Sequence, residues 1–168
     1  MSQELRDLDI RLTSRLRVAE RPGGLRTLAV ILAHSGDSLL WLPGLLLLWW
    51  LGTDFWRGRA RALIIGIVIT AAVVTAVKLV VRRRRPAGEW GKLYRKTDPH
   101  SFPSGHAARV FMLAVMTIGF GPVWFAATLA VWAPLVSLAR AAMGVHYLSD
   151  VLAGMALGAA IGVILTVV

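Results

Sequence analysis

The stretch ALIIGIVITAAVVTAVKLVV, residues 62–81, is followed at once by the basic cluster RRRRP, residues 82–86. Twenty predominantly apolar residues are the length that an α-helix needs to cross the hydrocarbon core of a bilayer. A run of arginines directly after such a segment is typical of residues that stop a span at the membrane surface. This stretch therefore predicts a transmembrane helix.

The rest of the chain carries the same signal. Hydrophobic residues make up 57% of the 168 residues, and the mean hydropathy is +0.65, well above the composition of soluble domains. We expect an all-α, polytopic transmembrane bundle of about five to six spans, folded as one domain over residues 1–168. Besides 62–81, the expected spans are residues 39–52, 104–120, 123–143 and 148–168. The first should begin near the polar residues 34–38 and be tilted or bent.

The N-terminal arm, residues 1–24, has a different pattern. Its leucines at positions 5, 8, 12 and 16 recur every three or four residues, with arginines and acids between them. This spacing predicts an amphipathic helix that lies on the membrane surface, and the Pro-Gly-Gly sequence at 22–24 should end it.

Charge and cysteine content exclude several functions. The net charge is +10, but the basic residues cluster between apolar runs, which favours contacts with lipid headgroups over binding to nucleic acid. The chain has no cysteine, so disulfides, thiolate catalysis and cysteine-ligated metals are excluded.

Three polar patches end apolar runs and carry the candidate chemistry: residues 78–86, 102–106 and 140–150. Ionisable side chains beside hydrocarbon are costly to keep, so they indicate a functional site. If the three helix ends lie on one membrane face, their cations converge on a pocket suited to a phosphate.

In the first patch, Lys78 precedes Arg85 by seven residues, and Pro86 follows. We expect the helix to run to Pro86, which ends it, so that both side chains project from the same face, with Lys78 deeper and Arg85 at the rim. The alternative is that Arg82 to Arg84 only hold the span in place and that Lys78 reaches to the interface.

In the second patch, Pro103 and Ser104 precede an apolar run. Ser104 is predicted to cap the helix, and the free N–H groups of the first turn would form an anion site that Gly105 lets a phosphate approach closely. His106 would then lie beside the anion, although a capped helix with an interfacial histidine gives the same pattern.

In the third patch, Arg140, His146 and Asp150 follow one another. Four residues of separation place His146 and Asp150 one helical turn apart, so that the carboxylate can hold Nδ1–H and present Nε2 as nucleophile or base. Zinc binding by the two histidines and Asp150 is disfavoured because the surrounding cations repel a metal ion. We therefore expect neither metal nor cofactor.

The remaining histidines receive no role. His100 is interpreted as a loop residue, and His34 with Asp37 as interfacial. Arg109, one turn after His106, either lines the mouth of the site or faces another helix.

Together these motifs resemble the type 2 phosphatidic acid phosphatase superfamily of membrane lipid phosphatases. That family has Lys-x6-Arg-Pro, then Pro-Ser-Gly-His, then Ser-Arg-x5-His-x3-Asp, and the region 78–150 of this chain matches in order and spacing. The one departure is Ala139, which stands in place of the serine. Residues 1–60 match nothing diagnostic.

The resemblance implies a role for each matched residue. Phosphate oxygens would be bound by Lys78, Arg85, Ser104, Gly105 and Arg140. His146, oriented by Asp150, would attack phosphorus to give a phosphohistidine, and His106 would protonate the leaving oxygen and then activate water, without a metal. A phosphoryl or headgroup transferase and a non-catalytic membrane component are the alternatives.

The arginines of the arm and of residues 82–96 orient the chain. With five spans, both lie on one side, and the positive-inside rule makes that side cytoplasmic. A sixth span would invert the argument. We expect a protein of the bacterial inner membrane that acts on a polyprenyl-linked phosphate or phosphatidylglycerophosphate, or on undecaprenyl pyrophosphate if the site faces outward.

Overall fold

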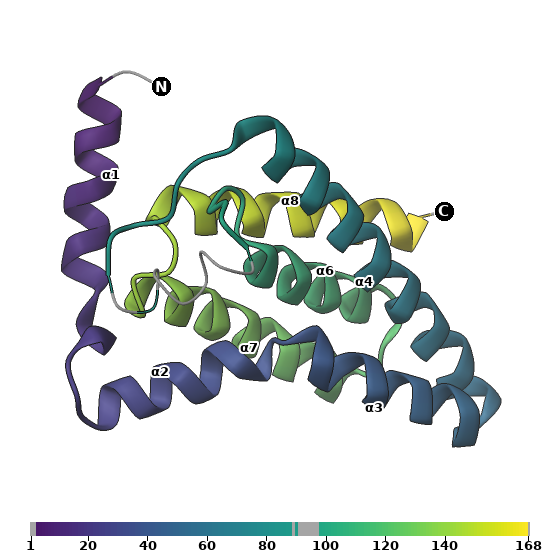
Figure 1. Cartoon of the computed structure of the whole chain (residues 1–168). Helices are drawn as coiled ribbons and strands as arrows, with labels where there is room; N and C mark the ends of the chain where they lie inside the picture. Colours follow the sequence, from purple (N-terminus) through teal and green to yellow (C-terminus); the bar gives the residue numbers. More distant parts are fainter. Residues whose placement is uncertain (1–2, 89, 91–97, 168) are drawn as a thin grey trace.

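The computed structural model describes residues 3–88, 90 and 98–167, and their regular structure is helical, as predicted. The helices are α1 (Gln3–Leu16), α2 (Gly24–Ser35), α3 (Ser38–Leu51), α4 (Asp54–Val81), α6 (Gly105–Phe120), α7 (Val123–Ala142) and α8 (Leu148–Val167), with a 3₁₀ turn at Val18–Glu20. Figure 1 shows the bundle, with α1 along one side of it, at the ends of α7 and α8.

Within the described residues, three helices are long and apolar enough to cross a membrane alone: α4, α7 and α8. Helices α2 and α3, which are bent by 45° at their junction, are long and apolar enough only as a pair, so the candidate spans number four if this pair is one broken span. The expected bend is present between Ser35 and Ser38, within the predicted polar residues 34–38, and the apolar helix α2 precedes it. The remaining predicted span, α6, has 16 residues and is roughly 24 Å long, so the count of five depends on this shorter helix.

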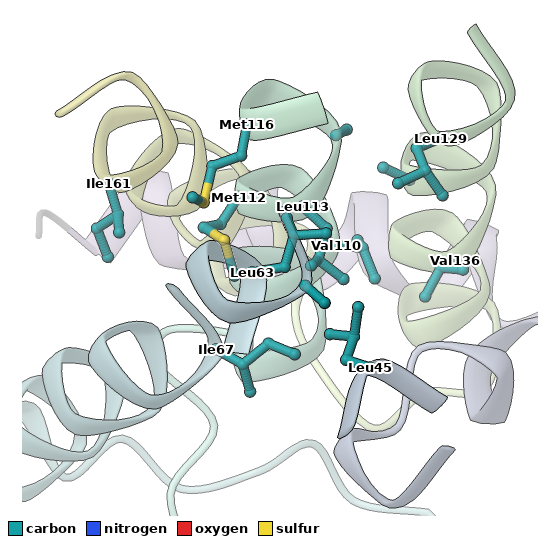
Figure 2. Close-up of a cluster of buried hydrophobic side chains, with 13 residues drawn as sticks. Leu45, Leu63, Ile67, Val110, Met112, Leu113, Met116, Leu129, Val136 and Ile161 are labelled. Carbon is teal, nitrogen blue, oxygen red and sulfur yellow. The ribbon is translucent and has the colours of Figure 1, made fainter. Parts of the chain in front are cut away.

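Helix α6 occupies the middle of the bundle, between α4, α7 and α8. Its side chains Met112, Leu113 and Met116 are almost fully buried and meet Leu63 and Ile67 of α4 (Figure 2). A helix that is covered by protein on several faces need not match the bilayer thickness by itself. Its position between α4, α7 and α8 therefore explains why α6 can be shorter than the other helices of the bundle that surround it.

The pair α6 and α8 packs most closely, through glycines on α8. A Cβ placed on Gly158 would collide with the carbonyl oxygen of Ala108, and one on Gly162 would lie 2.8 Å from Cβ of Val115. These glycines, with Gly154 one turn earlier, let the two helix backbones approach.

Helix α1 lies across the ends of α7 and α8 (Figure 1). It ends at Leu16, earlier than predicted, because a 3₁₀ turn intervenes before the Pro-Gly-Gly sequence. Its leucines at 5, 8 and 12 are exposed, whereas Asp9 and Thr13 are buried against the bundle. The Oγ1 of Thr13 accepts a hydrogen bond from the backbone N–H of Leu148 at 3.0 Å, which fixes α1 beside the start of α8.

Candidate active site

Four helix ends bring the three motifs together at one cavity of about 530 Å³. The cavity lies where α4 and α7 end and where α6 and α8 begin. Six of the eight predicted site residues line it: Lys78, Arg85, Gly105, His106, Arg140 and His146. Ser104 and Asp150 are fully buried beside it.

Lys78 and Arg85 meet, although not by the predicted route. Helix α4 ends at Val81 because Arg82 adopts a left-handed conformation, with φ 48°, and donates its N–H to the carbonyl of Lys78. The chain then continues to Pro86 without helix, and Arg84 forms an isolated bridge with His100. The prediction that one helix face presents both cations is therefore wrong. A loop carries Arg85 back to the cavity instead.

The carboxylate of Asp98 joins the two cations. Its Oδ2 pairs with the ammonium of Lys78 and accepts a hydrogen bond from Nη2 of Arg85 at 2.7 Å. Burial raises the pKa of Asp98, but the hydrogen bond and charge of Lys78 and the charge of Arg85 outweigh burial and hold the pKa below its ordinary value of 3.8. The side chain is therefore an anion at neutral pH. It lies where two cations of the predicted phosphate site converge.

His146 lies in the connection between α7 and α8 and is 1% exposed. Its Nδ1 is 2.8 Å from the carbonyl oxygen of Ser101, and its Nε2 is 3.1 Å from Nη1 of Arg85. A carbonyl oxygen can only accept a hydrogen bond, so Nδ1 of His146 must carry the hydrogen, and Nε2 of the neutral ring keeps its lone pair. Burial, followed by the charges of Arg85, Arg140 and Lys78, lowers the pKa of His146 well below its ordinary value of 6.5. The free imidazole is therefore neutral and suited to nucleophilic attack.

The predicted contact between His146 and Asp150 is looser than expected. Oδ2 of Asp150 is 3.8 Å from Nδ1 of His146 and accepts from the backbone N–H of Tyr147 at 2.9 Å. His146 precedes α8, so it does not lie one helical turn from Asp150. The expected hydrogen bond to Nδ1–H is made by Ser101, and Asp150 adds a nearby negative charge.

Arg83 connects Asp150 to α1, although its sequence position indicated only a basic stop to a span. Its guanidinium donates to Oδ1 of Asp150 and to Oδ2 of Asp9, both at 2.7 Å. It also lies over the ring of Tyr147, 4.0 Å from the centroid. Asp9 accepts two further hydrogen bonds from Ser149. Helix α1 is therefore linked to Asp150, beside the candidate active site, through Arg83.

At the start of α6, the predicted cap is confirmed. The hydroxyl of Ser104 accepts a hydrogen bond from the backbone N–H of Ala107 at 3.5 Å. Gly105 and His106 follow it and line the cavity. Arg109 also lines it and donates to the carbonyl of Gly36 at 2.6 Å, so both alternatives for this residue apply.

Sequence reasoning missed three residues at this site. Asp98 pairs with the cations, and His100 lines the cavity. Asp37, interpreted as interfacial, pairs with Nε2 of His106. Each lies between apolar runs, outside the three motifs, and only the folded chain shows what it contacts. Within residues 3–88, 90 and 98–167, no group of three histidines, cysteines or acids is placed to hold a metal ion.

Comparisons with known proteins identify the family of this chain. The model of the PAP2 superfamily matches residues 59–168. The chain is 34% identical over 151 residues to the decaprenylphosphoryl-5-phosphoribose phosphatase of Mycobacterium tuberculosis, covering 88% of this chain and 81% of that protein. It is also 34% identical over 139 residues to the undecaprenyl-diphosphatase of Sulfolobus acidocaldarius, covering 80% of this chain and 66% of that one.

Solved structures share the fold. The crystal structure of Aquifex aeolicus LpxE superposes with a TM-score of 0.77 and 25% identity over 96% of each chain. A transmembrane PAP2-type phosphatidylglycerolphosphate phosphatase from Bacillus subtilis gives a TM-score of 0.78 and 20% identity, covering 98% of this chain and 85% of that one. The three motifs, the helical membrane fold and the match over residues 59–168 lead to one conclusion: this chain belongs to the PAP2 superfamily.

Proposed function

We propose that the chain is a membrane lipid phosphatase that removes the terminal phosphate of a polyprenyl-linked phosphate lipid through a phosphohistidine. The observation that carries the proposal is the convergence of Lys78, Arg85 and Arg140 with two histidines on one cavity. The names of two relatives, each 34% identical, support a polyprenyl lipid as the substrate.

The three cations bind the phosphate and stabilise the charge that develops on its equatorial oxygens. Arg85 and Arg140 are 4% and 1% exposed, so their charges act in a low-dielectric environment where they are stronger than in water. Fixed guanidinium and ammonium groups supply what a metal ion supplies in other phosphoryl-transfer enzymes. We therefore infer that catalysis needs no metal.

In the first step, Nε2 of His146 attacks phosphorus as the bond to the lipid oxygen breaks, and His106 gives its proton to that oxygen. In the second step, His106 takes a proton from water, the hydroxide oxygen bonds to phosphorus, and the bond to His146 breaks. Inorganic phosphate leaves and both histidines return to their starting state. The carbonyl of Ser101 and the charge of Asp150 stabilise His146 while it carries the phosphoryl group.

Among polyprenyl lipids, we favour a polyprenyl-phosphoryl sugar as the substrate. The phosphate removed would be a monoester on the sugar. The cavity of about 530 Å³ is lined on one side by apolar atoms of Ala71, Val74 and Leu79, so it offers room beyond a phosphate group and a wall for carbon atoms. The relative that covers 88% of this chain carries the name of such an activity. A lipid diphosphate is the second candidate because the other relative is named a diphosphatase.

The test is phosphate release by the purified protein in detergent, with EDTA present throughout. The substrates are a polyprenyl-phosphoryl-5-phosphoribose, undecaprenyl diphosphate and phosphatidylglycerophosphate. We expect the highest kcat/KM for the first, without added metal. An enzyme that is inactive in EDTA and recovers with magnesium or zinc would refute the mechanism. Preference for undecaprenyl diphosphate would select the second candidate.

We further propose that the protein resides in the bacterial inner membrane with its site on the cytoplasmic face. The contacts of α1 with α8 support a shared face for the arginine-rich arm and the catalytic helix ends, and arginine-rich segments favour the cytoplasm. Because the chain has no cysteine, single cysteines can report the orientation. Ser14→Cys should resist a membrane-impermeant maleimide in intact cells, and Thr53→Cys should react. The reverse pattern would place the site outside.

A further inference from the structure

The junction between α2 and α3 carries an aspartate that the proposed mechanism does not use. Oδ1 of Asp37 pairs with Nε2 of His106, and its Oδ2 is 2.8 Å from Nδ1 of His34. Asp37 lies outside the 59–168 segment that matches the superfamily model. It is nevertheless the carboxylate in contact with the histidine expected to transfer protons.

The junction is held in place by contacts from several helices. Arg109 of α6 donates to the carbonyl of Gly36, and Trp132 of α7 donates from Nε1 to Oγ of Ser35 at 2.9 Å. The indole of Trp41 donates to the carbonyl of Ser35 at 3.0 Å. A Cβ on Gly36 would lie 2.9 Å from Val136 and 3.1 Å from Val110. The bend in the first span therefore fixes the position of the neighbouring Asp37 carboxylate.

The cations around His106 give a neighbouring carboxylate an electrostatic role. The cations Lys78, Arg85, Arg109 and Arg140 share its cavity, and together they oppose a positive charge on the imidazole. A general acid must carry that charge before it gives up its proton. A carboxylate in contact with the ring offsets the repulsion and also fixes the ring orientation.

We propose that Asp37 is a positioning residue for His106: it orients the imidazole and stabilises its protonated form during leaving-group departure. This inference rests on the acid and base role of His106 in the proposed function. With Nε2–H directed to Asp37, the proton exchanged with the substrate is carried on Nδ1. That proton goes to the lipid oxygen in the first step and is replaced from water in the second. Asp37 itself stays ionised.

The alternative is that the pair only ties the bent span to α6. The two roles differ in their dependence on the leaving group, because the phenolate of an aryl phosphate departs with little need for protonation by an acid. The parameter to compare is kcat/KM, which covers the steps up to departure of the first product. For Asp37→Asn, we expect kcat/KM for the lipid phosphate to fall about 100-fold and that for p-nitrophenyl phosphate to fall less than about fivefold. Asp37→Glu should recover part of the loss.

A double variant separates positioning from an independent effect. If Asp37 acts through His106, then Asp37→Asn in combination with His106→Ala should cost no more than His106→Ala alone. The matched control is Asp54→Asn, which changes a 99% exposed aspartate at the start of α4 and should leave both substrates unaffected. Thermal melting in detergent confirms that each variant folds.

The outcomes distinguish this inference from the function on which it rests. A wild-type protein without phosphatase activity would refute the proposed function. An aryl phosphate that does not rescue His106→Ala would refute the role of His106 as an acid. Equal losses for both substrates in Asp37→Asn, or losses that multiply with those of His106→Ala, would refute the positioning role of Asp37 while leaving the phosphatase intact.

Discussion

Replacement of Asp98 by asparagine should make the protein bind inorganic phosphate more tightly. The carboxylate of Asp98 pairs with both Lys78 and Arg85, so a phosphate oxygen that approaches these cations must displace it. Asparagine keeps the size of the side chain and removes its charge. The variant should therefore present the two cations to an incoming anion without an internal competitor.

The magnitude follows from the geometry. Two unit charges about 4 Å apart attract by about 4 kcal/mol at an effective dielectric constant near 20. The side chain of Asp98 is 38% exposed, and exposed ion pairs contribute only about 0.2–1 kcal/mol. An intermediate value of about 1–2 kcal/mol corresponds to a roughly 5- to 30-fold lower inhibition constant for phosphate.

The assay is competitive inhibition of p-nitrophenyl phosphate hydrolysis by inorganic phosphate, and then by orthovanadate, at constant ionic strength. Asp7→Asn removes an exposed carboxylate of α1 and is the charge-matched control, for which we expect no change. An inhibition constant for Asp98→Asn that is unchanged or higher than that of the wild type would show that Asp98 does not compete with phosphate, and the reasoning would fail.

Three further predictions concern the nucleophile, the interfacial helix and the packing of the bundle. His146→Ala should lower kcat roughly 10³-fold or more, and 32P-labelled substrate should leave no acid-labile phosphoprotein after rapid quenching; a labelled variant would exclude His146 as the nucleophile. Asp9→Asn should destabilise the protein by about 1.5–3 kcal/mol at pH 7, measured by thermal melting. Burial opposes ionisation of Asp9, but hydrogen bonds from Ser149 and Arg83 lower its pKa below 3.8, so the difference should persist above pH 3.8 and vanish on further acidification; a constant difference would contradict this origin. Gly158→Val should cost at least about 1–3 kcal/mol, because its Cβ collides with the backbone of α6, and unchanged melting would show that the contact is dispensable.

The helical membrane fold and the three motifs that line the cavity could be predicted from the sequence because both depend on local patterns. Apolar length sets the spans, and Ser104 caps α6 through neighbouring residues. The predicted route of Arg85 into the site failed because the left-handed Arg82 ends α4 early, and the apolar run gave no sign of that turn.

The contacts of Asp37 and Asp98 could not be predicted for a different reason. Asp37 pairs with His106 and Asp98 pairs with Lys78, and each partner lies 20 or more positions away in the sequence. In the sequence, an isolated acid between apolar runs looks like a residue at the membrane interface. The contacts of Arg83 could not be predicted either, because it is one of four consecutive arginines, residues 82–85. Only the packing of α1 and α8 distinguishes it from them.

The glycine contacts between α6 and α8 have a consequence for how such an enzyme can diverge. The two helices meet backbone to backbone at Gly158, and their N-terminal ends adjoin His106 and His146, the two histidines proposed to act in catalysis. The spacing of the reacting groups is thus set by main chain, which substitutions elsewhere leave in place. The side chains of the apolar wall on α4, Ala71, Val74 and Leu79, take no part in that backbone contact. We therefore expect substitutions in that wall to change which lipid is accepted while the spacing of His106 and His146 stays the same.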